Sequence, residues 1–123
     1  EIIKYYQISD KVIIQSFSEE SLQKIHSLHA NIPLVQLLSY QKSVQLNELE
    51  IEKYKTYCIG LGMNYKYIDS AYVKKIKKHG LEVHPFTVDN EKDMKKLLSW
   101  GVDGMFTNYP DRLHSILDLK NHK

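Results

Sequence analysis

The chain has little cysteine, no long apolar run and no concentration of charge of one sign. Its 123 residues include one cysteine, Cys58, so neither an internal disulfide nor a multi-thiolate zinc site can form. No apolar stretch approaches the roughly 20 residues that span a bilayer. The first residues, Glu1 to Lys4, lack an initiator Met and a signal-peptide pattern, and resemble a cut rather than a beginning. We therefore expect a globular chain without a transmembrane segment, in a compartment that the sequence does not specify.

The charges nearly balance, which bears on possible partners. Lys and Arg number 17 against 15 Asp and Glu, for a net charge of +2. Phosphate-backbone binding needs a far stronger positive surface, so we expect no nucleic-acid partner. Because no Ser/Gly/Pro-rich linker or charge block interrupts the chain, we expect residues 1–123 to form a single unit.

Short apolar runs alternate with helical periodicity, which is typical of βα units in a parallel sheet. We expect strands at residues 11–17, 34–38, 56–62, 81–88 and 104–107. We expect each strand to be followed by a helix or an irregular segment, and a helix remnant at residues 2–8. Ser18, Asp69 and either Asp89 or Asn90 are suited to begin helices, and Gly80 and Gly101 to end them.

Five βα units fit either an open doubly wound sheet or a stretch of a (β/α)₈ barrel. A whole barrel takes about 250 residues, so this chain cannot close one. The sequence favours the barrel segment over the doubly wound sheet, because no Gly-rich strand-to-helix turn for phosphate binding is present. A barrel segment would leave two strand edges unpaired and its inner face without an opposite wall, and would need a partner piece.

Two blocks, in this order, resemble glycerophosphodiester phosphodiesterases. The first is Val12–Leu22, where a strand ending in Ser-Phe leads into a helix, followed by Ile32–Leu34. The second contains His79–Val88 and Gly101–Asp111 and is similar to the C-terminal signature of that family. The resemblance covers nearly the whole chain. It implies an α/β fold, the C-terminal portion of about five βα units of a (β/α)₈ TIM barrel.

The resemblance also implies an activity for the complete barrel. Members of the family hydrolyse glycerophosphodiesters such as glycerophosphocholine to sn-glycerol 3-phosphate and an alcohol, with a divalent cation. The family's His-Arg-Gly, acidic pair, further His and Glu-x-Lys strand lie upstream of the matched part and are absent from this sequence. We therefore carry over no catalytic residue and no metal ligand. We expect calcium or magnesium to be held outside this chain, and the chain alone to be inactive.

The resemblance assigns a substrate wall to this part of the barrel. Phe17 and Phe86 match family positions that pack against the glycerol carbons, although Phe86 stands where Trp is common. Without the resemblance, both would be read as core aromatics. Gln15 and Ser16 either hydrogen-bond phosphate or satisfy backbone groups near the strand end. Asn108 replaces a frequent Asp and is assigned to loop geometry at the barrel rim.

Three further features receive structural interpretations. His84 precedes Phe86 on one predicted strand, and we interpret it as structural or as support for the site. Cys58 lies between apolar strand neighbours and is expected to be an inert buried thiol. His26 and His29 are three residues apart on a helix, but no third ligand accompanies them, so we expect no metal there.

Two classes of function remain open. The first is the C-terminal section of a glycerophosphodiester phosphodiesterase, with the N-terminal half of the barrel as partner. The second is a non-catalytic half-barrel that self-associates or pairs with another chain through its open edges. The sequence does not specify the leaving alcohol or the cation.

Overall fold

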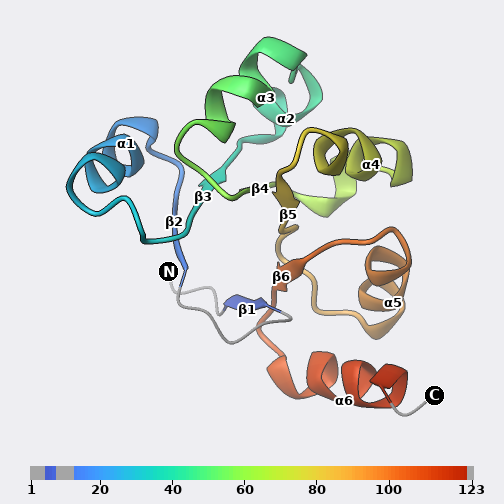
Figure 1. The fold of residues 1–123 in the computed structure, drawn as a ribbon. Helices are drawn as coiled ribbons and strands as arrows, with labels where there is room; N and C mark the ends of the chain where they lie inside the picture. Colours follow the sequence, from blue (N-terminus) through green and yellow to red (C-terminus); the bar gives the residue numbers. More distant parts are fainter. Residues whose placement is uncertain (1–4, 8–12, 122–123) are drawn as a thin grey trace.

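A computed structural model describes residues 5–7 and 13–121 and shows an arc of strands with helices on its outer side (Figure 1). The strands are β1 (Tyr5–Gln7), β2 (Ile14–Ser16), β3 (Leu34–Leu37), β4 (Gly60–Gly62), β5 (Glu82–Val83) and β6 (Gly104–Phe106). The helices are α1 (Glu19–Leu28), α2 (Tyr40–Val44), α3 (Glu48–Lys55), the 3₁₀ helix η1 (Tyr65–Tyr67), α4 (Ser70–Lys78), α5 (Glu91–Ser99) and α6 (Pro110–Asn121). From β2 onward, helices follow strands as the sequence predicts.

The strands from β2 to β6 lie side by side in chain order. Strands β2, β3, β4 and β5 form a parallel sheet in that order. Beyond β5, the Phe106 amide donates to the Pro85 carbonyl at 2.9 Å and the Val88 amide to the Phe106 carbonyl at 2.8 Å. A doubly wound sheet would reverse direction at a switch point, whereas a barrel adds each strand next to the last. The α/β prediction, a C-terminal portion of about five units of a (β/α)₈ barrel, is confirmed.

The two faces of the sheet pack differently because side chains alternate along each strand. Leu61, Val83 and Met105 point outward and pack with the helices in one buried apolar cluster. Leu37, Phe86 and Phe106 lie on the inner face. Gly62 faces the same side, since a Cβ built on it would meet the side chains of Leu37 and Phe106.

The helix ends follow the capping residues that the sequence indicates. Ser18 accepts a hydrogen bond from the Ser21 amide, and Asp69 accepts one from the Tyr72 amide. Asn90, rather than Asp89, caps α5. Gly80 and Gly101 have φ values of 89° and 92°, the left-handed conformation that glycine adopts without strain.

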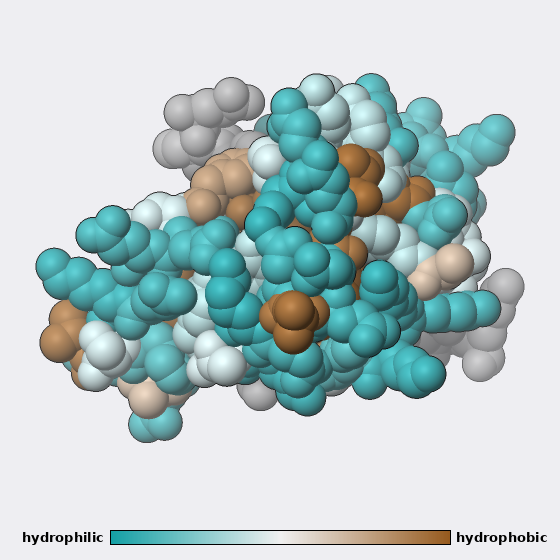
Figure 2. Space-filling model, turned by 90° about the horizontal axis from the view of Figure 1, so that it is seen from above, coloured by the Kyte–Doolittle hydropathy of each residue, from teal (hydrophilic) through white to brown (hydrophobic). Residues whose placement is uncertain are grey.

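The face of the molecule that carries α2 and α3 is mostly polar. Seen from the side of α2 and α3, most of the surface is hydrophilic and hydrophobic residues are scattered (Figure 2). No helix within residues 13–121 combines the length and apolar character needed to cross a bilayer.

The strands are shorter than predicted, and β4 and β5 are much shorter, each for a local reason. The strand predicted from residue 56 begins only at Gly60, because the Tyr57 and Cys58 amides donate back to the Tyr54 carbonyl at the end of α3. Strand β5 has only two regular residues, and Pro85 has no amide to donate. Its ladder nevertheless continues, since the His84 amide donates to the Leu61 carbonyl. Helix α2 was not predicted.

The N-terminal segment differs from the prediction of a helix at residues 2–8. Tyr5–Gln7 form strand β1, which pairs antiparallel with β6, Tyr6 opposite Met105. The open edge of β6 presents backbone groups that need partners, which favours an extended segment here. The remainder of the predicted helix, and residues 11 and 12 of the first predicted strand, lie outside the described residues.

Candidate functional site

A pocket of about 470 Å³ lies on the inner face of the arc, where the strands end. Its lining comes from four segments that are distant in the sequence: Gln15, Ser16, Phe17, Ser18, Leu37, Phe86 and Phe106. Parallel strands bring their C-terminal ends to one edge, the place where barrel proteins bind ligands. The four residues predicted for the substrate wall, Gln15, Ser16, Phe17 and Phe86, are all among them.

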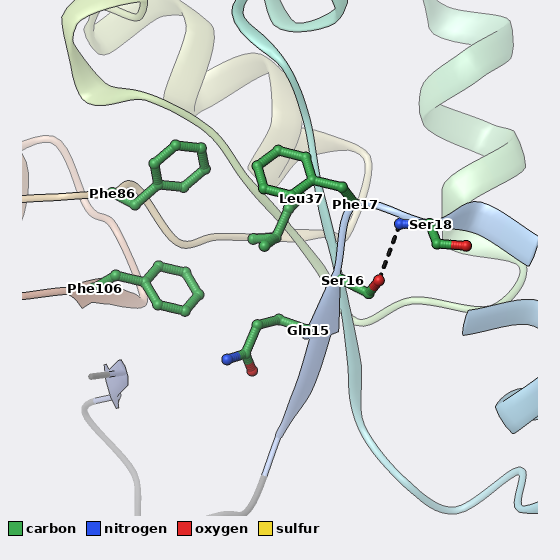
Figure 3. A pocket seen from close by; sticks show the side chains of 7 residues that line it. All are labelled: Gln15, Ser16, Phe17, Ser18, Leu37, Phe86 and Phe106. Atoms are coloured by element: carbon green, nitrogen blue, oxygen red, sulfur yellow. Dashed lines mark hydrogen bonds between the residues drawn. The ribbon is translucent and has the colours of Figure 1, made fainter. Parts of the chain in front are cut away.

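Three phenylalanine rings form a connected wall (Figure 3). The Phe17 and Phe86 ring centroids are 6.0 Å apart at 76°, and those of Phe86 and Phe106 are 6.2 Å apart at 73°. Both pairs are edge-to-face, the arrangement that aromatic quadrupoles favour. Phe106 is 2% exposed and Phe17 59%, so the wall runs from the buried interior to the surface.

The polar groups of the pocket come from β2 and the turn after it. The Gln15 side chain extends from β2 toward the rings (Figure 3). The Ser16 hydroxyl accepts a hydrogen bond from the Ser18 amide at 3.0 Å, so at least part of its role is to satisfy the backbone before α1. Neutral amide and hydroxyl groups of this kind can hydrogen-bond oxygens of a polar ligand.

A buried glutamine fixes the backbone on which this wall stands. The Gln36 amide nitrogen donates to the carbonyls of Phe17 at 3.1 Å and Leu37 at 3.2 Å, and its oxygen accepts from the Tyr57 hydroxyl at 2.9 Å. Gln36 therefore ties the end of β2 to the end of β3. Reasoning from the sequence missed this residue, because its partners Phe17 and Tyr57 are 19 and 21 positions away in the chain.

Leu37, Phe106 and Ser18 were also missed as lining residues. A usable signal existed for the first two, since Leu37 and Phe106 are the next-to-last residues of predicted strands, close to the level of Phe17. Alternation along those strands places them on the inner face. Ser18 was assigned only to helix capping, which the structure confirms.

The described residues do not fit a divalent cation. No group of three or more His, Cys, Asp or Glu side chains within them is arranged to hold a metal ion. The pocket lining carries amide, hydroxyl and hydrocarbon groups but no carboxylate, whereas calcium and magnesium sites are built on carboxylate oxygens.

His84 lies on the inner face below the pocket without lining it. Its side chain is fully buried, and its Nε2 is 2.8 Å from Glu82 Oε1. A Cβ on Gly60 would lie 3.1 Å from His84 Cδ2, so glycine at this position leaves room for the imidazole. This arrangement supports the structural interpretation of His84.

The rim after β5 and β6 is held by Asp89. Its carboxylate accepts from the Asn108 amide at 2.8 Å and from the Thr107 hydroxyl at 3.2 Å, while Arg112 Nη1 donates to its backbone carbonyl at 2.7 Å. Partial burial opposes ionisation, but the hydrogen bonds and the Arg112 charge outweigh it and lower the pKa of Asp89. Asn108 thus serves the loop geometry that was predicted for it.

Cys58 is buried at the other end of the strands, away from the wall. Burial raises the pKa of its thiol to about 12, so the thiolate is scarce at neutral pH. This fits the inert thiol that its apolar neighbours predict.

Fold and pocket together define the class of protein. Consecutive parallel βα units with a pocket at the C-terminal strand ends make this chain a section of a (β/α)₈-barrel protein. The sequence profile of the glycerophosphoryl diester phosphodiesterase family matches residues 1–112. The chain belongs to that family.

Curated relatives agree with this assignment. The chain is 50% identical over 106 residues to a glycerophosphodiester phosphodiesterase of Bacillus subtilis (strain 168), covering 86% of this chain and 36% of that protein. It is 32% identical over 115 residues to a glycerophosphodiester phosphodiesterase of Bacillus altitudinis, covering 91% and 45%. The chain therefore spans less than half the length of these two relatives.

Solved structures share the fold. A phosphodiesterase from Oleispira antarctica, in complex with the product sn-glycerol-3-phosphate, superimposes with a TM-score of 0.76 at 24% identity, covering 92% of this chain and 44% of that one. A glycerophosphodiester phosphodiesterase from Parabacteroides distasonis gives a TM-score of 0.67 at 25% identity, covering 87% and 43%.

Proposed function

We propose that this chain supplies the substrate wall and much of the frame of a glycerophosphodiester phosphodiesterase, with residues 1–123 acting as a single unit. In the complete barrel the reaction is hydrolysis of a glycerophosphodiester to sn-glycerol 3-phosphate and an alcohol. The observation that carries the proposal is the convergence of Gln15, Ser16, Phe17 and Phe86 on one pocket in a member of this family.

Each group in the pocket has a role suited to this substrate. The rings of Phe17 and Phe86 offer apolar surface to the glycerol carbons, and Phe106 extends that surface inward. The Gln15 amide and the Ser16 hydroxyl can donate hydrogen bonds to phosphate oxygens. The wall thus binds and orients the substrate, and the proton transfers belong to residues outside this chain.

The reaction also requires a divalent cation, which we propose to be calcium or magnesium held by carboxylates outside this chain. A cation bound there would neutralise negative charge on the phosphate. The pocket described here lacks the carboxylates to bind one. We therefore assign no step of the reaction to metal ligands in residues 13–121.

An activity assay with fragments tests the proposal. This chain is assayed alone and after mixing with the N-terminal half of the barrel, with glycerophosphocholine and either calcium or magnesium. We expect release of sn-glycerol 3-phosphate only from the mixture, and a loss of turnover in a mixture that carries Phe86→Ala. Substantial turnover by this chain alone would contradict the division of roles.

A non-catalytic half-barrel is a second candidate, favoured by the pairing of β1 with β6. The edge of β6 accepts β1 as an added strand, so a strand of a second copy or of another chain could bind there in place of β1. Size-exclusion chromatography with light scattering separates the two candidates. A stable dimer that does not dissociate on adding the N-terminal half would favour the non-catalytic module.

A further inference from the structure

Two tyrosines beside the pocket stack on one another at the surface. The ring centroids of Tyr40 and Tyr67 are 5.1 Å apart, and the ring planes are inclined by 27°. Tyr40 is 49% exposed and Tyr67 47%, so the pair leaves about half of its aromatic surface open to solvent. The rings come from α2 and η1, two segments that follow neighbouring strands and contact each other.

Both tyrosines are connected to the pocket through short stretches of backbone. Tyr40 lies three residues after Leu37, a lining residue, which limits the distance between their Cα atoms to about 11 Å. Tyr67 belongs to η1, whose first amide, that of Tyr65, donates to the Phe86 carbonyl at 3.1 Å. The pair therefore stands on the segments that follow β3 and β4, next in the chain to residues that line or support the pocket, although neither ring lines it.

The protein's own cations leave this pair available. Within the described residues, cation–ring contacts join Lys53 to Tyr54, Lys96 to Trp100 and Arg112 to Tyr109. None of these contacts involves Tyr40 or Tyr67. Lys42, two residues after Tyr40, forms an ion pair with Glu50 instead.

Open aromatic faces that lack a protein cation attract weakly hydrated organic cations. The negative face of a phenol ring favours a quaternary ammonium group, which has no N–H to hydrogen-bond with water. We propose that Tyr40 and Tyr67 form a subsite for the alcohol portion of the substrate, selective for alcohols with a quaternary ammonium group. The inference rests on the proposed function for the position of the glycerol phosphate, but the subsite can be tested without catalysis.

Direct binding is measured first, by NMR titration of this chain with choline and with 3,3-dimethyl-1-butanol, its neutral isostere. We expect choline to shift the ring resonances of Tyr40 and Tyr67, and the isostere to shift them several-fold less at equal concentration. The Tyr109 ring, which Arg112 covers at 4.0 Å, is the internal control and should not move. Equal shifts with both compounds, or none, would overturn the inference, even if the complete enzyme is active.

Selectivity is measured second, in the barrel completed with its N-terminal half. The ratio of kcat/KM for glycerophosphocholine over glycerophosphoglycerol is compared among wild type, Tyr40→Ala, Tyr67→Ala and the control Tyr109→Ala. We expect the ratio to fall roughly five-fold in the first two variants. The rate with glycerophosphoglycerol should fall less than the rate with glycerophosphocholine in them, and the control ratio should not change. An unchanged ratio in an active enzyme would refute the selectivity. Absence of any turnover would count against the proposed function, while the choline titration still decides the subsite.

Discussion

Phe17 and Phe106 line the same pocket but differ in burial. Their contributions to stability and to ligand binding should therefore differ. Phe17 is 59% exposed, so its truncation removes little buried surface. We expect Phe17→Ala to lower the free energy of unfolding by less than about 1 kcal/mol while weakening binding of sn-glycerol 3-phosphate severalfold. Isothermal calorimetry and urea denaturation measure the two effects.

Phe106→Ala is the matched contrast. Phe106 is 2% exposed, and removing a buried ring of this size costs about 3–5 kcal/mol through lost burial and the cavity left behind. A Phe17→Ala variant that is destabilised as strongly as Phe106→Ala would show that Phe17 is a core residue rather than part of a binding wall.

Two buried hydroxyl groups offer a second comparison of residues. The Tyr57 hydroxyl donates to Gln36 at 2.9 Å, whereas the Tyr72 hydroxyl is buried without a hydrogen-bond partner in the described part of the chain. Tyr57→Phe leaves the Gln36 oxygen unsatisfied and should cost about 1–3 kcal/mol. Tyr72→Phe should be neutral or stabilising by up to about 1 kcal/mol.

Denaturation of the two variants under the same conditions provides the measurement. Since Gln36 also holds the Phe17 carbonyl, Tyr57→Phe should also disturb the pocket wall. Equal destabilisation of both variants would contradict the hydrogen-bond assignment.

At the scale of elements, the contact between β4 and β5 depends on glycine. A Cβ on Gly60 would lie 2.9 Å from both the Cβ and the backbone oxygen of Glu82, and the backbone cannot yield cheaply. We expect Gly60→Ala to destabilise the chain by about 1–3 kcal/mol through overpacking. Thermal denaturation followed by circular dichroism measures the effect.

Gly101→Ala tests a cost in backbone conformation rather than a steric clash. No atom lies within 4 Å of its added Cβ, but its φ of 92° disfavours any other residue. The expected cost of about 1–2 kcal/mol is therefore conformational. If Gly60→Ala leaves the melting temperature unchanged, the steric explanation for Gly60 is wrong.

The loops after β5 and β6 should make stability depend on pH through Asp89. Because its folded pKa is lowered below the ordinary 3.8, the unfolded state binds the proton more readily. The stabilisation is complete well above 3.8 and is lost as pH falls through the folded pKa. Asp89→Asn should cost about 1–2 kcal/mol at pH 7, and its difference from wild type should shrink below about pH 4. Urea denaturation across pH measures both curves, and a difference that does not change with pH would exclude ionisation as the cause.

Local patterns predicted the elements well where the cause is local. The caps at Ser18 and Asp69 depend only on residues within three positions, and both are confirmed. The late start of β4 was missed, because the Tyr57 amide donates to the end of α3 instead of joining the sheet. The capping of α5 by Asn90 rather than Asp89 depends on Asn108 across the rim, which local pattern does not reveal.

Only part of the pocket could be predicted from the sequence, because some of its contacts join distant segments. The family resemblance placed Phe17 and Phe86, and strand alternation could have added Leu37 and Phe106. The supporting bonds of Gln36 could not be predicted, since they need the spatial register of β2 against β3. The strand at Tyr5–Gln7 was also missed, because its partner β6 is about a hundred residues further along the chain.

At the scale of the whole molecule, the open arc predicts that a partner stabilises it. Strand β2 is the outermost strand of the four-stranded sheet, and β6 pairs on its far side with the antiparallel β1. Adding the N-terminal half of the barrel should raise the melting temperature of this chain in proportion to the logarithm of partner concentration. Differential scanning fluorimetry over a concentration series measures this. A melting temperature independent of partner would contradict the barrel-section assignment.

The edge-to-face rings of Phe17, Phe86 and Phe106 come from three separate βα units. Protons at the edge of one ring lie over the face of the next ring, whose ring current shifts their NMR frequency. Any sliding of one unit against another would change those frequencies, without a label or a ligand. The chemical shifts of these ring protons should therefore report whether the barrel has closed.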